Sequence, residues 1–361
     1  MHNNRNDMEL FLLSYYIKYD KLLELNSLVD ADQYTNCIDI YIDVYDMIRR
    51  IYGFSTTGVS KFTITAAIIN LAAHFRAYYR TRHHIWSRIF LVYGSEITNN
   101  HRQFCPTFSN FIDSTVVGYE RTNSLIKSQI ELVKILAAYI DDVYYIERTT
   151  DFTMFTYDSI SKTLQHSPNS ISIIVSKNKY AYQIPAMFLG RKIYLFRPSK
   201  YKGEDWSICV TPNTAITAYY SKVQKDDARA RLQAMHPELL SMLMVLNGCK
   251  DKAVPSFINI DKASRILDAA INMNLILNSY QSNAAWVYDS LCKISDINKS
   301  FTLESFTNRF HALDLSYQYI LYSNMLEAKD ISWNLNLNDP DTVRDINNKY
   351  FIDIPLNLND L

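Results

Sequence analysis

The chain has 361 residues, and its 37 basic and 37 acidic side chains leave no formal net charge. This length allows one large domain or two smaller ones, each with a sizeable apolar core. The 5 cysteines lie far apart without a CxxC pair, which argues against a zinc site and favours a reducing compartment. No apolar run approaches the ~20 residues of a membrane-spanning helix, and the first residues lack a signal-peptide pattern, so we expect no membrane partner.

Tyrosine is abundant and glycine is scarce in this chain, with 27 and 7 residues respectively. The scarcity of glycine, together with the absence of any dinucleotide-binding or P-loop glycine motif, argues against a loop that cradles phosphates. Many tyrosines, asparagines and isoleucines are typical of an AT-rich coding genome. A bacteriophage or another virus is therefore a plausible source.

Residues 1–36 show an amphipathic helical pattern and carry no recognisable chemistry. The segment CIDIYID at 37–43 alternates and is rich in β-branched residues, which predicts a strand that ends at Asp43. We then predict a helix over 63–79 and a second strand over 85–93. A strand, a helix and a strand in this order predict a parallel sheet.

The stretch from 47 to 95 contains no acidic residue. Its basic residues are interleaved with tyrosine and histidine, which is typical of a contact with a phosphate backbone. The nucleic-acid-binding candidates in this stretch are Arg49, Arg50, Arg76, Arg80 and Arg82. The alternative is a helix with a solvated basic face that acids elsewhere in the chain balance.

A helix over 122–140, a third strand over 141–147 and a helix over 149–164 follow. Asp151 falls in the first turn of the last of these helices, where a carboxylate interacts favourably with the helix dipole. The threonines just before it would cap the helix. Asp151 is therefore either an ordinary first-turn residue or a functional carboxylate.

The most informative stretch is ISIIVSKNKYAYQIP at 171–185. Its apolar beginning, 171–175, predicts a buried strand, because the run is too short for a helix. The next residues turn the chain, and Tyr180 begins a short helix that we expect Pro185 to end. A strand, a polar turn and a helix in this order place the turn at the carboxyl edge of a parallel sheet, where such sheets bind ligands.

Further strands are predicted over 192–197 and 206–210. A helix is predicted over 211–246, with a break near Lys225. More helices follow, and the chain ends in a polar tail, 334–361, that we expect to be extended or partly ordered.

Residues 236–275 predict a helical hairpin. Its first helix ends at Asn247 and Gly248, where the glycine suits a left-handed stop. A loop with Pro255 follows, and an amphipathic helix then begins near Asp261, which we expect to be the N-cap.

The turn after the buried strand resembles that of flap endonucleases and 5′–3′ exonucleases of the PIN-like nuclease class. In that family the matching strand runs into Ser-x-Asp-x-Asp-x-x-Gln-Leu, and the two aspartates hold a divalent metal. Ser176 and Gln183 keep this frame, whereas Asn178 and Tyr180 stand at the aspartate positions. The resemblance covers about 37–275, roughly two thirds of the chain.

Only two metal-ligand positions of the family have an acid in register here. Asp43 matches the aspartate that ends the family's first strand, and Asp151 stands for the glutamate of its Glu-Ala-Asp-Asp motif. The other positions carry Tyr93, Thr153, Met154, Asn178, Tyr180, Cys249 and Lys252. Cleavage with two metals needs several carboxylates clustered around ions about 4 Å apart. The resemblance therefore implies a degenerate site without a resident metal, with Asp43 and Asp151 as the residual catalytic or metal candidates.

The predicted hairpin is similar to the helix–three-turn–helix element of the same family, which grips duplex DNA through backbone amides and a potassium ion. The residues that match its frame are Leu246, Gly248, Val254 and Pro255. Lysines at the turn and in the hairpin join the nucleic-acid-binding candidates: Lys177, Lys179, Lys250 and Lys252. A plain helical hairpin is the alternative.

The predicted fold is α/β, with a parallel central sheet flanked by helices and a helical region after it. We expect an N-terminal helical segment at 1–36 and a PIN-like α/β domain at 37–210. A helical region with the hairpin follows at 211–333, and the tail occupies 334–361.

The resemblance implies a catalytically inactive, nuclease-like pseudoenzyme that binds nucleic acid or serves as a scaffold in a bacteriophage or other virus. Its expected partners are DNA and other viral proteins, in the host cytoplasm or the virion. One alternative is an active Mg²⁺-dependent 5′ nuclease or flap endonuclease with relocated acids, drawn from Asp39, Asp43, Asp46, Glu96, Asp141, Asp142 and Asp151. The other is a structural virion protein without nucleic-acid contact. Metal-dependent cleavage identifies the first alternative, and the lack of salt-sensitive DNA binding identifies the second.

Overall fold

The computed structural model describes residues 37–47, 86–94, 142–148, 152–198, 207–249 and 254–319, with single positions between 68 and 137. The predicted N-terminal segment and the predicted tail lie outside the described residues. Of the helices predicted over 63–79 and 122–140, only scattered positions are described; those at 72 and 133, for example, are helical and buried.

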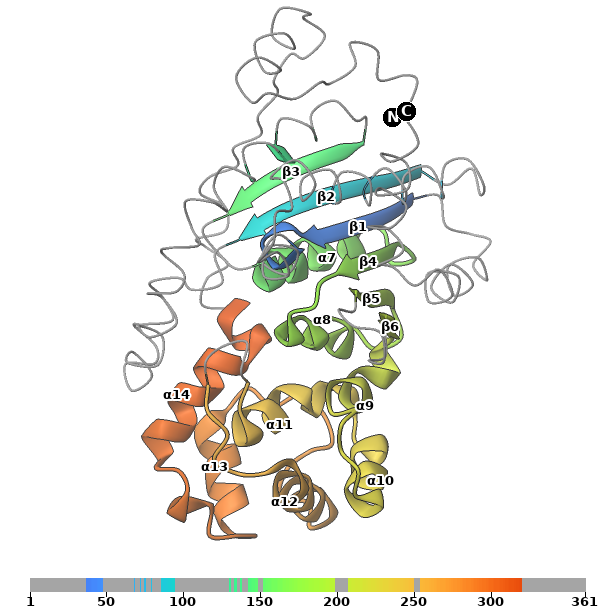
Figure 1. Ribbon diagram of the computed structural model, residues 1–361. Helices are drawn as coiled ribbons and strands as arrows, with labels where there is room; N and C mark the ends of the chain where they lie inside the picture. Colours follow the sequence, from blue (N-terminus) through green and yellow to red (C-terminus); the bar gives the residue numbers. More distant parts are fainter. Residues whose placement is uncertain are drawn as a thin grey trace, which may run out of the picture.

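The described strands form one sheet of six, in the order β3-β2-β1-β4-β5-β6 (Figure 1). Their bounds are β1 Cys37–Asp43, β2 Trp86–Gly94, β3 Val143–Arg148, β4 Ile171–Val175, β5 Lys192–Pro198 and β6 Ser207–Val210. Every neighbouring pair is parallel except the last, because β6 runs antiparallel to β5. The α/β fold with a largely parallel sheet, flanked by helices and followed by a helical region, is therefore confirmed.

Apolar side chains cover both faces of the sheet, since alternate residues of a strand point to opposite faces. Ile38, Ile40 and Ile42 of β1 belong to the core on one face, and Tyr41 belongs to the core on the other. The core that contains Tyr41 continues into the helices after the sheet, where it includes Leu243 of the segment 240–247. The helical part is thus anchored to the sheet by shared burial of apolar surface, which drives folding.

The other named elements of the described chain are helices, joined by turns and loops (Figure 1). Their bounds are α7 Phe152–His166, η3 Lys179–Tyr182, α8 Gln183–Met187, η4 Pro212–Thr214, α9 Ala215–Tyr219, α10 Asp226–Ala234, η5 Pro237–Leu239, α11 Leu240–Asn247, α12 Ile260–Asn272, α13 Ala284–Cys292, η7 Ile297–Lys299 and α14 Leu303–Leu313. One more helical turn begins at 315 and is described to 319.

The helix predicted over 211–246 is broken into several pieces. The predicted break near Lys225 exists, because α9 ends at Tyr219 and α10 begins at Asp226. A second, unpredicted break separates α10 from α11 at His236. This residue precedes Pro237, whose ring disfavours helical backbone in the residue before it.

Pro185 does not end the short helix after β4, contrary to the prediction. The 3₁₀ turn η3 leads directly into α8, and Pro185 is the third residue of α8. The amides of a helix's first turn have no intrahelical carbonyl to bond, so a proline is tolerated there.

The hairpin of α11 and α12 has a glycine at the end of its first helix, as predicted. Gly248 has φ 95 and ψ 165, which lies outside the left-handed helical region but is likewise accessible almost only to glycine. A Cβ atom at this position would lie 2.5 Å from the carbonyl oxygen of Pro255. Any other residue would therefore force the loop of the hairpin to move.

The predicted N-cap of α12 is wrong by two residues. Asn259 is the N-cap, and its Oδ1 accepts the amide of Lys262 at 2.8 Å. Asp261 lies in the first turn of α12 instead.

Arg309 of α14 is buried in the core and forms hydrogen bonds with the hairpin of α11 and α12. Its side chain is 0% exposed, and its guanidinium lies 5.1 Å from the ring centroid of Phe257 and 4.9 Å from that of Phe301. Nε donates to the carbonyl of Val245 at 2.7 Å, and Nη1 donates to the carbonyl of Pro255 at 2.9 Å. One side chain therefore joins the end of α11 to the loop that precedes α12.

In the described part of the chain, no helix is long and apolar enough to cross a membrane.

A buried carboxyl group lies where α14 ends. Asp314 is 0% exposed, and its Oδ1 accepts the amide of Tyr317 at 2.7 Å and the hydroxyl of Tyr280 at 3.0 Å. Burial raises the pKa of Asp314 to about 6, although hydrogen bonds from Tyr317, Ser241 and Tyr280 oppose the shift. The folded chain therefore binds this proton more tightly than the unfolded chain does.

We predict that Asp314 makes the protein more stable as the pH falls from about 7 towards 4. A folded-state pKa roughly 2 units above the unfolded value corresponds to a gain of about 3 kcal/mol once the group is protonated in both states. The Asp314→Asn variant keeps an acceptor oxygen and does not titrate. Urea unfolding of both proteins across this pH range should show the wild type gaining stability relative to the variant. A constant difference between the two would contradict the prediction.

Candidate functional site

The candidate site lies at the carboxyl edge of the sheet, between β1 and β4. β1 pairs with β2 on one side and with β4 on the other, and all three strands are parallel. The chain therefore leaves β1 in one direction along the sheet and returns to its other side. Such a switch point opens a crevice at the carboxyl ends of the strands, which is where open parallel sheets bind ligands.

Two carboxylates lie at this edge, Asp43 at the end of β1 and Asp46 in the helical residues just after it, and both are 2% exposed. Asp43 Oδ2 accepts the hydroxyl of Ser176 at 2.9 Å, and Asp43 Oδ1 accepts the amide of Asp46 at 3.0 Å. Asp46 Oδ2 in turn accepts the amide of Lys177 at 2.8 Å. The two acids therefore tie the end of β1 to the turn that follows β4.

Asn178 shapes the turn itself. Its side chain is 3% exposed, and Oδ1 accepts the amide of Tyr180 at 2.9 Å, which caps η3. Its own amide donates to Ser176 Oγ at 3.0 Å. A side-chain oxygen at a helix start satisfies an amide that has no backbone partner, which is the usual role of asparagine there.

Tyr180 and Gln183 hold the segment after α14 against this turn. The hydroxyl of Tyr180, a residue 0% exposed, donates to Gln318 Oε1 at 2.9 Å. The Gln183 side chain donates to the carbonyl of Leu313 at 2.8 Å and accepts the amide of Leu315 at 3.2 Å. The side-chain amide of Gln183 thus bonds one backbone carbonyl and one backbone amide, on either side of Asp314.

The same segment is also bound to α7. Tyr319 donates its hydroxyl to Asp158 Oδ1 at 3.0 Å, and the hydroxyls of Tyr157 and Ser316 lie 3.4 Å apart. Gln318 Nε2 donates to two carbonyls at the end of α14, at 2.9 and 2.7 Å. The carboxyl edge of the sheet is therefore joined to the segment after α14 by a network of buried hydrogen bonds.

The structure brings together part of the predicted site set. Asp43, Lys177 and Lys179 lie at the same edge, and Lys179 Nζ stands 5.2 Å from the ring centroid of Tyr219. Lys177 is 7% exposed, so most of its side chain is buried. The remaining predicted residues lie outside the described residues: Asp151, Arg49, Arg50, Arg76, Arg80, Arg82, Lys250 and Lys252.

Sequence reasoning missed the partner of Tyr180. Gln318 lies 138 residues away along the chain, and no local pattern distinguishes it from other polar residues of a helix. Asp46 belongs to the pool of seven acids for a relocated metal site, and its spacing of three residues from Asp43 is the signal in the sequence that links the two.

The described residues do not supply the donors that a pair of magnesium ions requires. Asp43 and Asp46 are the described carboxylates beside the turn after β4, and three of their four oxygens accept hydrogen bonds that hold the turn. Within the described part of the chain, no group of three or more His, Cys, Asp or Glu side chains is placed to hold a metal. Hard divalent cations need more oxygen ligands than two engaged carboxylates provide.

Comparison with known sequences gives no family assignment. No model of a protein family matches the chain, and no curated protein matches it either.

Comparison with solved structures identifies the fold. A 5′-exonuclease of bacteriophage T5 with bound zinc ions superposes with a TM-score of 0.51 at 9% identity, over 78% of this chain and 91% of that one. A bacteriophage T5 flap endonuclease, in a pseudo-enzyme–product complex with DNA and metal ions, gives a TM-score of 0.51 at 8% identity, over 81% of this chain and 94% of that one. The chain therefore has a flap endonuclease-like fold, as the motif frame predicted.

We predict that the hydroxyl of Tyr180 stabilises the fold. Tyr180→Phe leaves a buried acceptor on Gln318 without its donor, which should lower the free energy of unfolding by about 1–3 kcal/mol. Tyr180→Asp, which introduces an acid at this position, should lower the free energy of unfolding further, because it buries a charge and leaves a cavity. Urea unfolding at neutral pH measures all of these variants.

The matched control is Tyr144→Phe on β3, where the side chain is 45% exposed. Exposed substitutions of this kind usually change stability by no more than about 0.5 kcal/mol. Equal stabilities for Tyr180→Phe and Tyr144→Phe would show that the bond to Gln318 does not hold the segment.

Proposed function

We propose that this chain is a catalytically inactive, nuclease-like protein that binds nucleic acid, or serves as a scaffold, in a bacteriophage or other virus. One observation carries the proposal. Asn178 and Tyr180 stand at the two positions where flap endonucleases have metal-binding aspartates, and both are buried. Asn178 holds the turn, and Tyr180 holds the segment after α14. The carboxyl edge of the sheet would then serve the fold rather than a metal.

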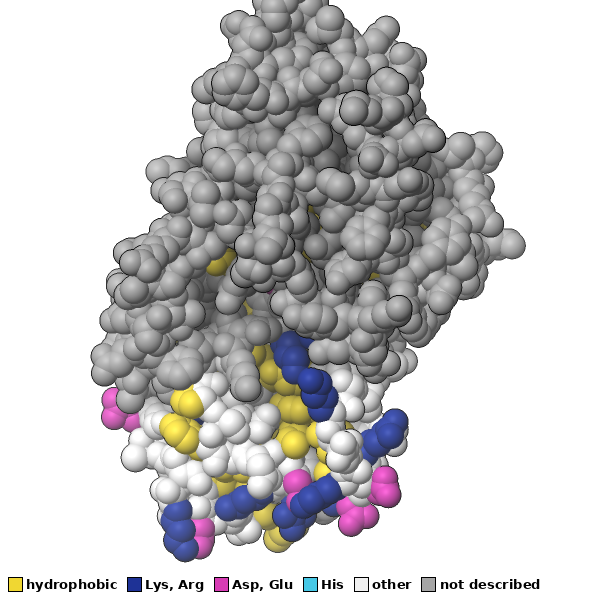
Figure 2. All heavy atoms as spheres, viewed as in Figure 1, with side chains coloured by type: hydrophobic (Ala, Val, Ile, Leu, Met, Phe, Trp, Pro, Cys, Tyr) yellow, Lys and Arg dark blue, Asp and Glu magenta, His cyan; other side chains and the backbone are white. Residues whose placement is uncertain are grey.

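Charge at the turn supports a contact with a phosphate backbone. Lys179 is partly exposed, and the ring of the buried Tyr219 lies beneath its ammonium group, so this edge presents a cation with which a phosphate could pair. Lys and Arg side chains border a strip of apolar side chains in the middle of the face shown in Figure 2. One of the similar structures is a DNA complex, which makes DNA the first ligand to test.

A viral source would place the protein in the host cytoplasm or in the virion. The composition favours such a source, and both similar structures belong to a bacteriophage. Other viral proteins would then be the partners of the scaffold role.

The second candidate is an active Mg²⁺-dependent 5′ nuclease with relocated acids, and the proximity of Asp43 and Asp46 favours it. Two other acids of the pool are placed elsewhere. Asp39 accepts both Nε and Nη2 of Arg88, at 2.7 and 2.8 Å. Asp142 precedes β3, at the amino end of that parallel strand and therefore at the opposite edge. Asp43 and Asp46 would need acids from outside the described residues, such as Asp151, to complete a metal site.

The experiment that tests the proposal is one titration of the full chain with a labelled nicked or flapped duplex. Magnesium or manganese is present first, and a chelator is then added. We expect binding that persists in chelator and weakens steeply with salt, and no cleavage, because phosphate contacts release counterions and no metal pair is held.

The matched variants are Lys179→Gln at the turn and Lys299→Gln, an exposed lysine of the helical part. Loss of one phosphate contact should lower the slope of log K against log salt by about 1 for Lys179→Gln and leave the control unchanged. Cleavage that stops with chelator would overturn the proposal in favour of the relocated site. If the protein neither binds nor cleaves the duplex, a structural role in the virion remains.

A further inference from the structure

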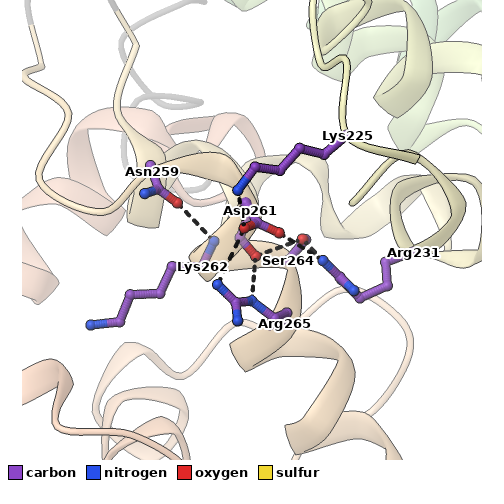
Figure 3. A network of polar contacts seen from close by, with 7 residues as sticks. All are labelled: Lys225, Arg231, Asn259, Asp261, Lys262, Ser264 and Arg265. Atoms are coloured by element: carbon purple, nitrogen blue, oxygen red, sulfur yellow. Dashed lines mark hydrogen bonds and ion pairs between the residues drawn. The ribbon is translucent and has the colours of Figure 1, made fainter. Parts of the chain in front are cut away.

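A second cluster of charged side chains lies far from the sheet edge along the chain, between α10 and α12 (Figure 3). Asp261 accepts Arg231 Nη2 at 2.8 Å, Lys225 Nζ at 3.1 Å and Arg265 Nη2 at 3.2 Å. We call these four side chains the Asp261 cluster. A single carboxylate therefore holds three cationic groups, one from just before α10, one from α10 and one from α12.

The cluster has an excess of positive charge. One carboxylate balances one cation, so two positive charges remain on groups that share the same carboxylate oxygens. Like charges held this close repel one another unless further negative charge is near. The neighbouring acids Asp226 and Asp227 are exposed residues of the first turn of α10, and neither forms an ion pair with the three cations in the described structure.

The three cations differ in how firmly they are held. Arg231 is the fixed one, because its side chain is 20% exposed and its Nε also donates to Ser264 Oγ at 3.3 Å. Lys225 and Arg265 are at the rim, with side chains 75% and 62% exposed. Long exposed side chains of this kind can leave one anion for another at little cost, since surface ion pairs are weak.

The positive charge of the cluster is carried by side chains. The amide of Lys262 is already taken by the side chain of Asn259, and the Lys262 side chain points away from Asp261 (Figure 3). The candidate ligand site therefore consists of side chains that two separate elements bring together. Guanidinium groups are suited to it, because their planar fork matches the oxygens of a phosphate group.

We propose that the Asp261 cluster binds a phosphate group, with Asp261 as an internal counter-ion that occupies the cations when no phosphate is bound. When a phosphate arrives, Lys225 and Arg265 turn outwards to it, while Arg231 remains on Asp261 and Ser264. The phosphate group belongs to a nucleic-acid backbone if the proposed function holds, and to a free phosphate ligand otherwise. The site is distinct from the turn at Lys179, where the proposed function expects a contact with nucleic acid.

The first arm of the test uses inorganic pyrophosphate and the full-length protein in isothermal titration calorimetry at low salt. Asp261→Asn keeps the shape of the side chain and removes its competing charge, so we expect pyrophosphate to bind roughly tenfold more tightly than to the wild type. The double variant Lys225→Gln, Arg265→Gln should lose the binding. Asp289→Asn, at an exposed carboxylate of α13, makes the same change in net charge and should stay within about twofold of the wild type.

Circular dichroism confirms that each variant is folded before its affinity is compared. The proposal is overturned if Asp261→Asn binds pyrophosphate no more tightly than Asp289→Asn does, or if the double variant binds as well as the wild type. In either case the cluster would be only a tie between α10 and α12.

The second arm identifies the source of the phosphate, with the labelled duplex in place of pyrophosphate. If Asp261→Asn strengthens duplex binding and the double variant weakens it, the ligand is a nucleic-acid backbone. If pyrophosphate binding responds to the variants and duplex binding is absent, the phosphate site stands and the nucleic-acid-binding part of the proposed function fails. If duplex binding is present but does not respond, the proposed function stands and the cluster takes a free phosphate.

Discussion

The described structure depends on how the carboxyl edge of its sheet is closed. A buried polar group must have a hydrogen-bond partner, because an unsatisfied one costs about 1–3 kcal/mol. Tyr180 and Gln183 meet this requirement through Gln318 and the backbone around Asp314. The same bonds fix the segment after α14 on the sheet, so one network both completes the α/β part and attaches the helical part to it.

This closure has a chemical consequence. A divalent metal needs several oxygen ligands that can turn towards it, and a nuclease site needs the substrate and water to reach that metal. The turn after β4 instead directs Asn178 to an amide and Tyr180 to a buried glutamine. Asp43 accepts the hydroxyl of Ser176, so this carboxylate at the end of β1 also holds the turn. The flap endonuclease-like fold rests on apolar strands, and those strands place no demand on the polar residues at their ends.

Much of the fold could be predicted from the sequence, because it rests on local patterns. The β-branched runs at 37–43 and 171–175 give strands with the predicted bounds, and strand–helix–strand order predicted parallel pairing correctly. Two local rules failed because the helices begin at other residues than the sequence pattern indicated. Pro185 is tolerated in the first turn of α8, and Asn259 caps α12 while Asp261 lies in its first turn. The candidate site was predictable only at Asp43 and the turn after β4, because the bonds from Tyr180 and Gln183 reach more than 125 residues along the chain.

The most direct test of the central claim is crystallography of the protein soaked in manganese, with anomalous scattering recorded near the manganese edge. We expect no manganese within coordination distance of Asp43 or Asp46, and a Tyr180 hydroxyl that remains bonded to Gln318. One or two manganese peaks bound by these carboxylates, with Asn178 and Tyr180 displaced, would contradict it. Such a result would mean that the carboxyl edge of the sheet is a metal site after all.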